Sequence, residues 1–248
     1  MAVASLLALA GCSSPTQPHL NALPPPSDRP ATTLTPPPPT PTTTTIPAAP
    51  VYTVATATGR SVAVYDSPGA AAPSRSLPSP QPDGSTLVLL AKEPQGDWLN
   101  VLLPVRPNGV TGWIRAADVT VTTHGFRIVV EVSAHKLTVW EGNDVFFEDT
   151  VAVGAPATPT ALGDFYTTGL FETGSTQPVY GPYAYPLSGY SEVLFSFGSG
   201  DGQMGIHGTN DPSSLGHSVS NGCIRMSNAG ITKLAKTLPV GVPVEVKA

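Results

Sequence analysis

The chain carries little charge and almost no cysteine. Of its 248 residues, 12% are Asp, Glu, Lys or Arg, the formal net charge is −5, and no run of basic residues occurs. Proteins that bind nucleic acid concentrate Lys and Arg in patches, so nucleic acid is excluded as an expected partner. The only cysteines are Cys12 and Cys223, so at most one disulfide is possible within the chain.

Long hydrophobic runs are also lacking. Residues 1–11 read MAVASLLALAG, which is apolar but too short to span a bilayer, and Cys12 follows. Residues 1–12 are similar to a bacterial lipoprotein signal, whose cleavage would leave Cys12 as a lipidated first residue anchored in the membrane. The positively charged start of an export signal is absent, so we expect the true start codon to lie upstream. The alternative is an ordinary cleaved signal in which Cys12 is incidental.

Proline is abundant but unevenly distributed. Residues 13–50 are rich in Pro and Thr, and Asp28 and Arg29 are the only charged residues among them. A segment of this composition cannot bury a core and favours extended polyproline-like conformations, so we expect a disordered stalk. At about 3.1 Å per residue it would span on the order of 100 Å.

Residues 51–122 contain short apolar or alternating runs separated by Pro, Gly and Asp, which is the pattern of a small all-β barrel. The pieces GDWLNV and TGWI, followed by ADV, resemble a bacterial Src-homology-3-like barrel. Trp98 and Trp113 would either form a groove that binds the bacterial cell wall or belong to the core of this barrel. We expect a spacer or substrate-positioning module without chemistry of its own.

Residues 125–248 also contain runs in which apolar and polar residues alternate. This pattern predicts a mostly antiparallel β-sandwich with one or two short helices, so the predicted fold class is mostly β. One helix is expected after Ser227 or Asn228, either of which can cap it. Its apolar face would include Ile231 and Leu234, and Pro239 would end it.

The candidate chemistry lies in two glycine-containing motifs, MGIHGTN at residues 204–210 and SNGCIRMSN at residues 220–228. A thiol attacks as the thiolate, and a neighbouring imidazole can take its proton and return it to a leaving amine. Gly222 would let backbone N–H groups approach an oxyanion, and the Gly208 carbonyl could orient the His207 ring. The alternative is that Cys223 is a buried small apolar residue and His207 a hydrogen-bonded strand histidine.

These motifs resemble the signature of the L,D-transpeptidase (YkuD-type) catalytic domain, a class of peptidoglycan cross-linking enzymes. The resemblance implies that Cys223 is the nucleophile, His207 the base and Gly208 the source of the orienting carbonyl. It also implies that the amides around Gly222 and Cys223 form the oxyanion hole and that Arg225 lies beside the nucleophile. It implies no cofactor and no metal.

Asn221 departs from the family pattern, because many members have His at that position. The resemblance implies that this position acts through its backbone, and we expect Ser220 and Asn221 to contact the substrate. The family places a flap over its donor site in the region that here contains Tyr180, Tyr183 and Tyr185. These tyrosines would either hold the stem peptide or cover an edge of the sandwich.

The expected reaction is formation of 3→3 cross-links between peptidoglycan stem peptides through a cysteine acyl-enzyme, with the Cys223 pKa lowered by its surroundings. The same site would act as an L,D-carboxypeptidase if water took the acyl group. A wall-binding lipoprotein with an inactive catalytic domain is the alternative without enzyme activity.

Two other classes of cysteine enzyme do not fit the sequence. A papain-like enzyme has the opposite order of Cys and His, and a sortase has a much longer separation between them. A zinc site is not expected, because the spacing of His207, His217 and Cys223 matches no common ligand pattern. The expected location is the cell envelope, at the outer face of the cytoplasmic membrane and reaching into the wall.

Overall fold

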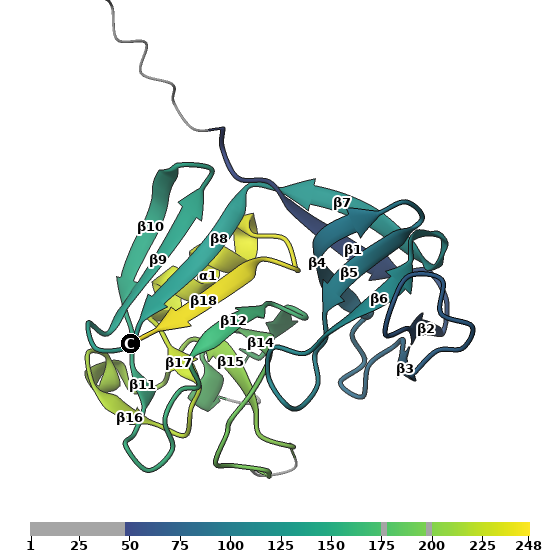
Figure 1. Cartoon of the computed structure of the whole chain (residues 1–248). Helices are drawn as coiled ribbons and strands as arrows, with labels where there is room; N and C mark the ends of the chain where they lie inside the picture. Colours follow the sequence, from purple (N-terminus) through teal and green to yellow (C-terminus); the bar gives the residue numbers. More distant parts are fainter. Residues whose placement is uncertain (1–47, 175–177, 197–199) are drawn as a thin grey trace, which may run out of the picture. The chain divides into compact units, whose positions relative to one another are not determined.

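Strands dominate the chain in the computed structural model, which describes residues 48–174, 178–196 and 200–248. The mostly-β prediction is confirmed, and one α-helix, α1 (Asn228–Thr237), occurs in these ranges (Figure 1). The expected signal segment, Cys12 and the stalk as far as residue 47 lie outside the described residues. Within the described part, no helix is long and apolar enough to cross a membrane.

Residues 52–124 form a five-stranded antiparallel sheet with the order β6-β5-β4-β1-β7, and a separate hairpin of β2 and β3. The apolar side chains of the sheet and the hairpin pack together, with Val62, Leu89 and Val101 fully buried. The elements of this part are β1 (Tyr52–Ala57), β2 (Ser61–Val64), β3 (Arg75–Pro78), β4 (Val88–Gln95), β5 (Trp98–Leu102), β6 (Thr111–Arg115), the 3-10 turn η1 (Ala116–Asp118) and β7 (Val119–His124).

This part of the chain is not the closed barrel that its sequence predicts. The hairpin joins the edge strand β6 only through an isolated bridge between Tyr65 and Trp113, in which each N–H donates to the other carbonyl at 2.8 Å. A single bridge leaves the sheet open, because closure needs a continuous ladder between the edge strands. Trp98 and Trp113 are both half-buried, and Trp98 packs edge-on against Tyr65 with a ring-centroid distance of 4.9 Å.

Residues 126–247 form two main sheets with the orders β10-β9-β8-β18-β12 and β13-β14-β15-β17, and a short pair of β11 and β16 (Figure 1). Most pairs are antiparallel, as predicted, but β8/β18, β15/β17 and β11/β16 are parallel. The strands are β8 (Phe126–Glu131), β9 (Lys136–Glu141), β10 (Asp144–Thr150), β11 (Val153–Gly154), β12 (Gly163–Tyr166), β13 (Phe171–Glu172), β14 (Tyr183–Tyr190), β15 (Gln203–His207), β16 (Ser218–Ser220), β17 (Ile224–Arg225) and β18 (Pro243–Lys247), with 3-10 turns η3 (Pro178–Tyr180) and η4 (Pro212–Ser214).

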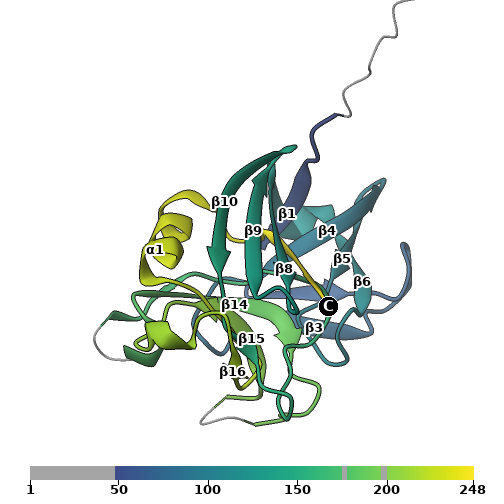
Figure 2. The same ribbon diagram turned by 90° about the vertical axis from the view of Figure 1, so that its left-hand side faces the viewer.

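Helix α1 begins at Asn228, the last residue of the cysteine motif. The Ser227 hydroxyl accepts from the Gly230 N–H and caps the helix, as the sequence predicts. The helix lies beside β10 (Figure 2), and Ile231 and Leu234 are fully buried in the core formed by the two sheets. Complete burial of such a side chain is worth about 1.5–3 kcal/mol, so these two residues fix the helix, and with it the end of the motif, to the core.

Candidate active site

The parallel pairing of β15 with β17 brings the two sequence motifs together. Ile206 is paired with Ile224, and His207 with Arg225. Ile206 and Ile224 are fully buried and point into the core. Cys223 directly precedes β17, so it lies beside the strand that carries His207 at its end.

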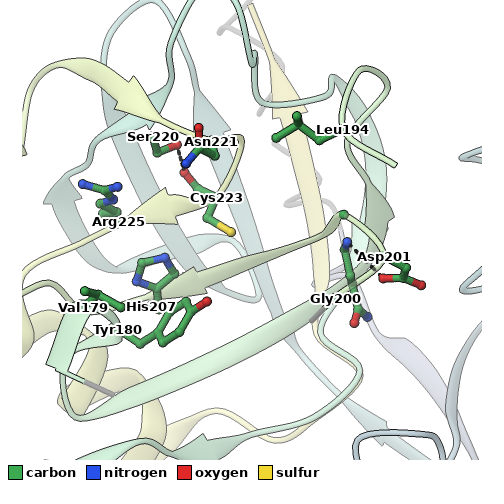
Figure 3. A pocket seen from close by; sticks show the side chains of 12 residues that line it. Val179, Tyr180, Leu194, Gly200, Asp201, His207, Ser220, Asn221, Cys223 and Arg225 are labelled. Carbon is green, nitrogen blue, oxygen red and sulfur yellow. Dashed lines mark hydrogen bonds between the residues drawn. The ribbon is translucent and has the colours of Figure 1, made fainter. Parts of the chain in front are cut away.

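Cys223 and His207 both line a cavity of about 540 Å³. Figure 3 shows the sulfur and the imidazole directed into it, with Arg225 to their left and Asn221 above. Four of the other residues predicted for the site also line this cavity: Tyr180, Ser220, Asn221 and Arg225.

His207 is 4% exposed and has a fixed ring orientation. Its Nδ1 lies 2.6 Å from the Gly208 carbonyl oxygen, and the Tyr180 ring packs edge-on against it with a centroid distance of 4.8 Å. Because a carbonyl can only accept, Nδ1 carries the proton and Nε2 is left as the basic nitrogen. The imidazole can therefore take a proton at Nε2.

The pKa of His207 is lowered to about 4. Burial is the largest cause, the hydrogen bond to Gly208 opposes it, and the charge of Arg225 adds to the lowering. The imidazole is consequently neutral at pH 7. A neutral imidazole is the form that can act as a general base.

The turn after His207 is held by the start of α1. The Asn228 side-chain oxygen accepts from the Thr209 N–H at 2.8 Å. A Cβ atom on Gly208 would lie 2.3 Å from this oxygen, closer than any tolerated contact. Glycine at position 208 is thus required by the close approach of Asn228.

Ser220 organises the loop that carries the thiol. Its hydroxyl donates to the Cys223 carbonyl at 2.5 Å and accepts from the Gly222 N–H at 3.1 Å. Thr158 holds the same loop from outside by donating to the Ser220 carbonyl at 3.0 Å. Gly222 has a φ of +108°, which L side chains rarely adopt.

These bonds change the predicted oxyanion hole. The Gly222 N–H is already bonded to Ser220, so it is not available to an oxyanion. Among the described residues, no acceptor takes the Cys223 N–H. Of the Gly222 and Cys223 backbone N–H groups, the Cys223 N–H is therefore the one that can donate to a developing oxyanion.

The pKa of Cys223 differs from the expectation. Burial raises it, and this effect outweighs the opposing backbone hydrogen bond of Gly205 and the charge of Arg225. The predicted lowering is wrong, because desolvation of the thiolate is the largest effect. In the described part of the chain, no hydrogen bond joins the sulfur to His207. The resting site thus holds a neutral thiol beside a neutral imidazole.

Two of the predicted substrate tyrosines do not reach the cavity. Tyr185 is 1% exposed and lies in the hydrophobic core, where its hydroxyl donates to the Leu238 carbonyl at 3.5 Å. Tyr183 is on the same strand and packs against the same core. The prediction of Tyr185 as a ligand-contacting residue is wrong, because alternation along β14 directs residues 185 and 187 inward.

The sequence did not indicate the rest of the cavity lining. Val179, Leu194, Gly200, Asp201, Gly202 and Gln203 line it in addition to the predicted residues. Gly200 and Gly202, just before the strand that ends at His207, could have indicated this lining, because glycines allow the backbone to approach a ligand closely.

The described residues contain no group of three or more His, Cys, Asp or Glu side chains that could hold a metal ion. The thiol, the imidazole and the Arg225 guanidinium line the same cavity, together with the polar side chains of Tyr180, Asp201, Ser220 and Asn221.

The comparisons with known proteins agree on one family. The family model of the L,D-transpeptidase catalytic domain, named YkuD, matches residues 125–246. YqjB of Bacillus subtilis, provisionally named an L,D-transpeptidase, is 36% identical over 125 residues, which cover 47% of this chain and 68% of YqjB. The chain belongs to the YkuD-type L,D-transpeptidase family.

YkuD of Bacillus subtilis, also provisionally named an L,D-transpeptidase, is 35% identical over 122 residues, which cover 49% of this chain and 65% of that protein. A solved L,D-transpeptidase from Mycobacterium smegmatis is 16% identical, with a TM-score of 0.42 and coverage of 66% of this chain and 90% of that one. A mutant L,D-transpeptidase from Enterococcus faecium is 24% identical, with a TM-score of 0.39 and coverage of 49% of each chain.

The YkuD-type domain of this chain runs from β8 into β18, so it contains both Cys223 and His207. The open sheet of β1 and β4–β7 precedes it. This sheet lies outside the family match.

Proposed function

We propose that the protein is a peptidoglycan L,D-transpeptidase that forms 3→3 cross-links through an acyl-enzyme on Cys223. The observation that carries the proposal is the shared cavity: the thiol faces it together with an imidazole whose Nδ1 is bound to Gly208 and whose Nε2 is basic. Family membership supports acyl transfer between peptides as the reaction class.

In the first half-reaction, the Cys223 sulfur attacks the carbonyl carbon at the L-centre of the diamino acid in a donor tetrapeptide stem. Nε2 of His207 takes the thiol proton as the S–C bond forms. It returns this proton to the nitrogen of the terminal D-alanine as the C–N bond breaks. The products are free D-alanine and a thioester.

The neutral resting pair suits this order of events. A thiol with a raised pKa is a poor nucleophile until a base removes its proton, and the neutral His207 is that base. The Cys223 amide would stabilise the oxyanion. The nearby Arg225 charge would favour the anionic states of the reaction.

In the second half-reaction, the side-chain amine of a neighbouring stem attacks the thioester. His207 accepts a proton from this amine and returns it to the sulfur, which restores the thiol. If water attacks instead, the product is a tripeptide and the enzyme acts as an L,D-carboxypeptidase.

The test is incubation of the full-length chain with purified tetrapeptide stems, followed by mass spectrometry of the products. Transpeptidation predicts equal amounts of released D-alanine and 3→3 dimer, and Cys223→Ser predicts neither. Tripeptide without dimer would instead assign the carboxypeptidase reaction. The absence of any product from the wild-type chain would favour the alternative of a wall-binding protein with an inactive domain.

We further propose that Cys12 is lipidated, so that the stalk of residues 13–50 holds the enzyme at the outer face of the cytoplasmic membrane and within reach of the wall. The support is the sequence LAGC at residues 9–12 and the Pro/Thr-rich composition that follows. Growth with an alkyne-labelled fatty acid should label the wild-type protein but not Cys12→Ala. Equal labelling of both would reject this anchor.

A further inference from the structure

Arg106 lies in the loop between β5 and β6, outside the family match, yet its guanidinium bonds to the catalytic domain. Nη1 donates to the Ser191 carbonyl at 2.5 Å, and Nη2 donates to the carbonyls of Leu194 at 3.0 Å and Asp201 at 2.9 Å. One side chain thus joins three carbonyls that belong to both ends of one connection between β14 and β15.

The guanidinium also contacts two aromatic rings of the catalytic domain. It lies 4.9 Å from the Tyr190 ring centroid and 4.8 Å from that of Phe195. Arginine combines a planar set of donors with a face that stacks on aromatic rings, and lysine cannot reproduce both. The contacts therefore use properties specific to arginine.

The same loop grips the catalytic domain at a second point. The Asn108 amide donates to the Tyr190 carbonyl at 2.8 Å, and its oxygen accepts from the Tyr190 N–H at 2.9 Å. The Tyr190 hydroxyl donates to the Pro104 carbonyl at 3.1 Å. Residues 104–108 consequently fix the end of β14 as well as the connection that follows it.

The residues held by Arg106 form a wall of the active-site cavity, defined here as Leu194 and residues 200–203. Figure 3 shows Leu194, Gly200 and Asp201 across the cavity from Arg225. The packing behind the wall is close: a Cβ atom on Gly202 would lie 2.0 Å from the Leu194 oxygen and 2.9 Å from Nη2 of Arg106. The position of the wall thus depends directly on the guanidinium.

We propose that Arg106 is a positioning residue that sets the width of the donor-binding cavity by holding this wall from the preceding sheet. The inference rests on the proposed function, since it takes the cavity as the donor site. The thiol and the imidazole are held by other contacts, through Ser220, Gly208 and Asn228. Loss of Arg106 should therefore weaken donor binding more than it slows the chemical step.

The test compares Arg106→Gln with Arg115→Gln in the full-length chain. Arg115 is a matched control, because its guanidinium lies 5.4 Å and 5.5 Å from the rings of Tyr65 and Trp98 and it does not line the cavity. For D-alanine release from the tetrapeptide donor, Arg106→Gln should raise KM about tenfold and change kcat less than about twofold. Arg106→Lys should have an intermediate KM. Equal KM values for the two glutamine variants would overturn the proposal.

Hydrogen exchange provides a readout that does not require activity. Arg106→Gln should increase deuterium uptake in peptides covering residues 190–203 and leave those covering residues 218–228 unchanged. Unchanged uptake at 190–203 would overturn the proposal even if the enzyme were active. An inactive wild-type chain would reject the proposed function, and the exchange result would still decide whether Arg106 holds the wall. If Arg106→Gln does not fold, Arg106→Lys supplies both measurements.

Discussion

Nδ1 of His207 lies 2.6 Å from the carbonyl oxygen of Gly208, the next residue in the chain. This contact leaves Nε2 as the basic nitrogen of a buried ring that faces the same cavity as Cys223. The orienting group is a backbone carbonyl, which bears no charge. The ring therefore gains no charged partner that would raise its pKa, and burial determines its protonation.

His207 should remain unprotonated, and so able to act as the base for Cys223 acylation, down to unusually low pH. The pKa of His207 is lowered to about 4, so the ring becomes protonated only when the pH falls to that value. The acid limb of kcat/KM for a tetrapeptide donor should accordingly have its midpoint near pH 4. A midpoint near 6.5, the ordinary value for histidine, would contradict this assignment.

Free Cys223 should react slowly with iodoacetamide at neutral pH. Burial raises the thiol pKa, so only a small fraction is thiolate and the rate should still be rising above about pH 8.5. Mass spectrometry of the peptide containing Cys223 gives the rate. Because Arg225 lowers the thiol pKa, Arg225→Gln should shift the curve to higher pH. A rate that levels off below pH 8 would contradict the raised pKa.

Gly208→Ala should strongly reduce activity. The added methyl group would lie 2.3 Å from the Asn228 oxygen, which cannot move away without losing its bond to Thr209. Displacement of the base by about 1 Å can cost about 10²-fold in rate. The control is Gly59→Ala, where the nearest atom, the Ser61 carbonyl oxygen, would be 3.7 Å away. Equal kcat/KM values for the two variants would show that the turn tolerates the methyl group.

Ser220→Ala should impair acylation by loosening the nucleophile loop. It removes a donor to the Cys223 carbonyl and leaves the Gly222 N–H without its acceptor. Loss of one such hydrogen bond costs about 1 kcal/mol and an unpaired buried group about 1–3 kcal/mol, so a decrease of about tenfold or more is expected. The control is Ser133→Ala, an exposed serine in the turn between β8 and β9. Acylation rates that match this control would reject the role given to Ser220.

The motifs around His207 and Cys223 predicted that these two residues share a site, because strand pairing places the ends of two adjacent motifs side by side. Register decides such proximity, and the alternating apolar residues Met204, Ile206, Ile224 and Met226 specify it by facing the core. The helix after Ser227 was predictable for a similar reason. Its cap and its apolar spacing are local properties of the chain.

The thiol pKa could not be predicted from the motif. It depends on how deeply the folded chain buries the sulfur, and the motif contains no measure of burial. Arg106 was not predictable either, because 85 residues separate it from Ser191 and nothing in the local sequence indicates the contact. Tyr185 was misassigned because its region was matched to the flap of the family, whereas the alternation of Tyr183, Tyr185 and Leu187 indicated a strand.

The most direct test of Cys223 as the nucleophile is the intact mass of the full-length chain after incubation with a carbapenem, compared with that of Cys223→Ala. The β-lactam carbonyl takes the place of the donor peptide carbonyl, and an activated thiol should open the ring and retain it as a thioester. We expect a stoichiometric mass increase on the wild-type chain and none on Cys223→Ala. An unmodified wild-type chain, or equal modification of both proteins, would contradict the assignment of Cys223 as the acyl acceptor.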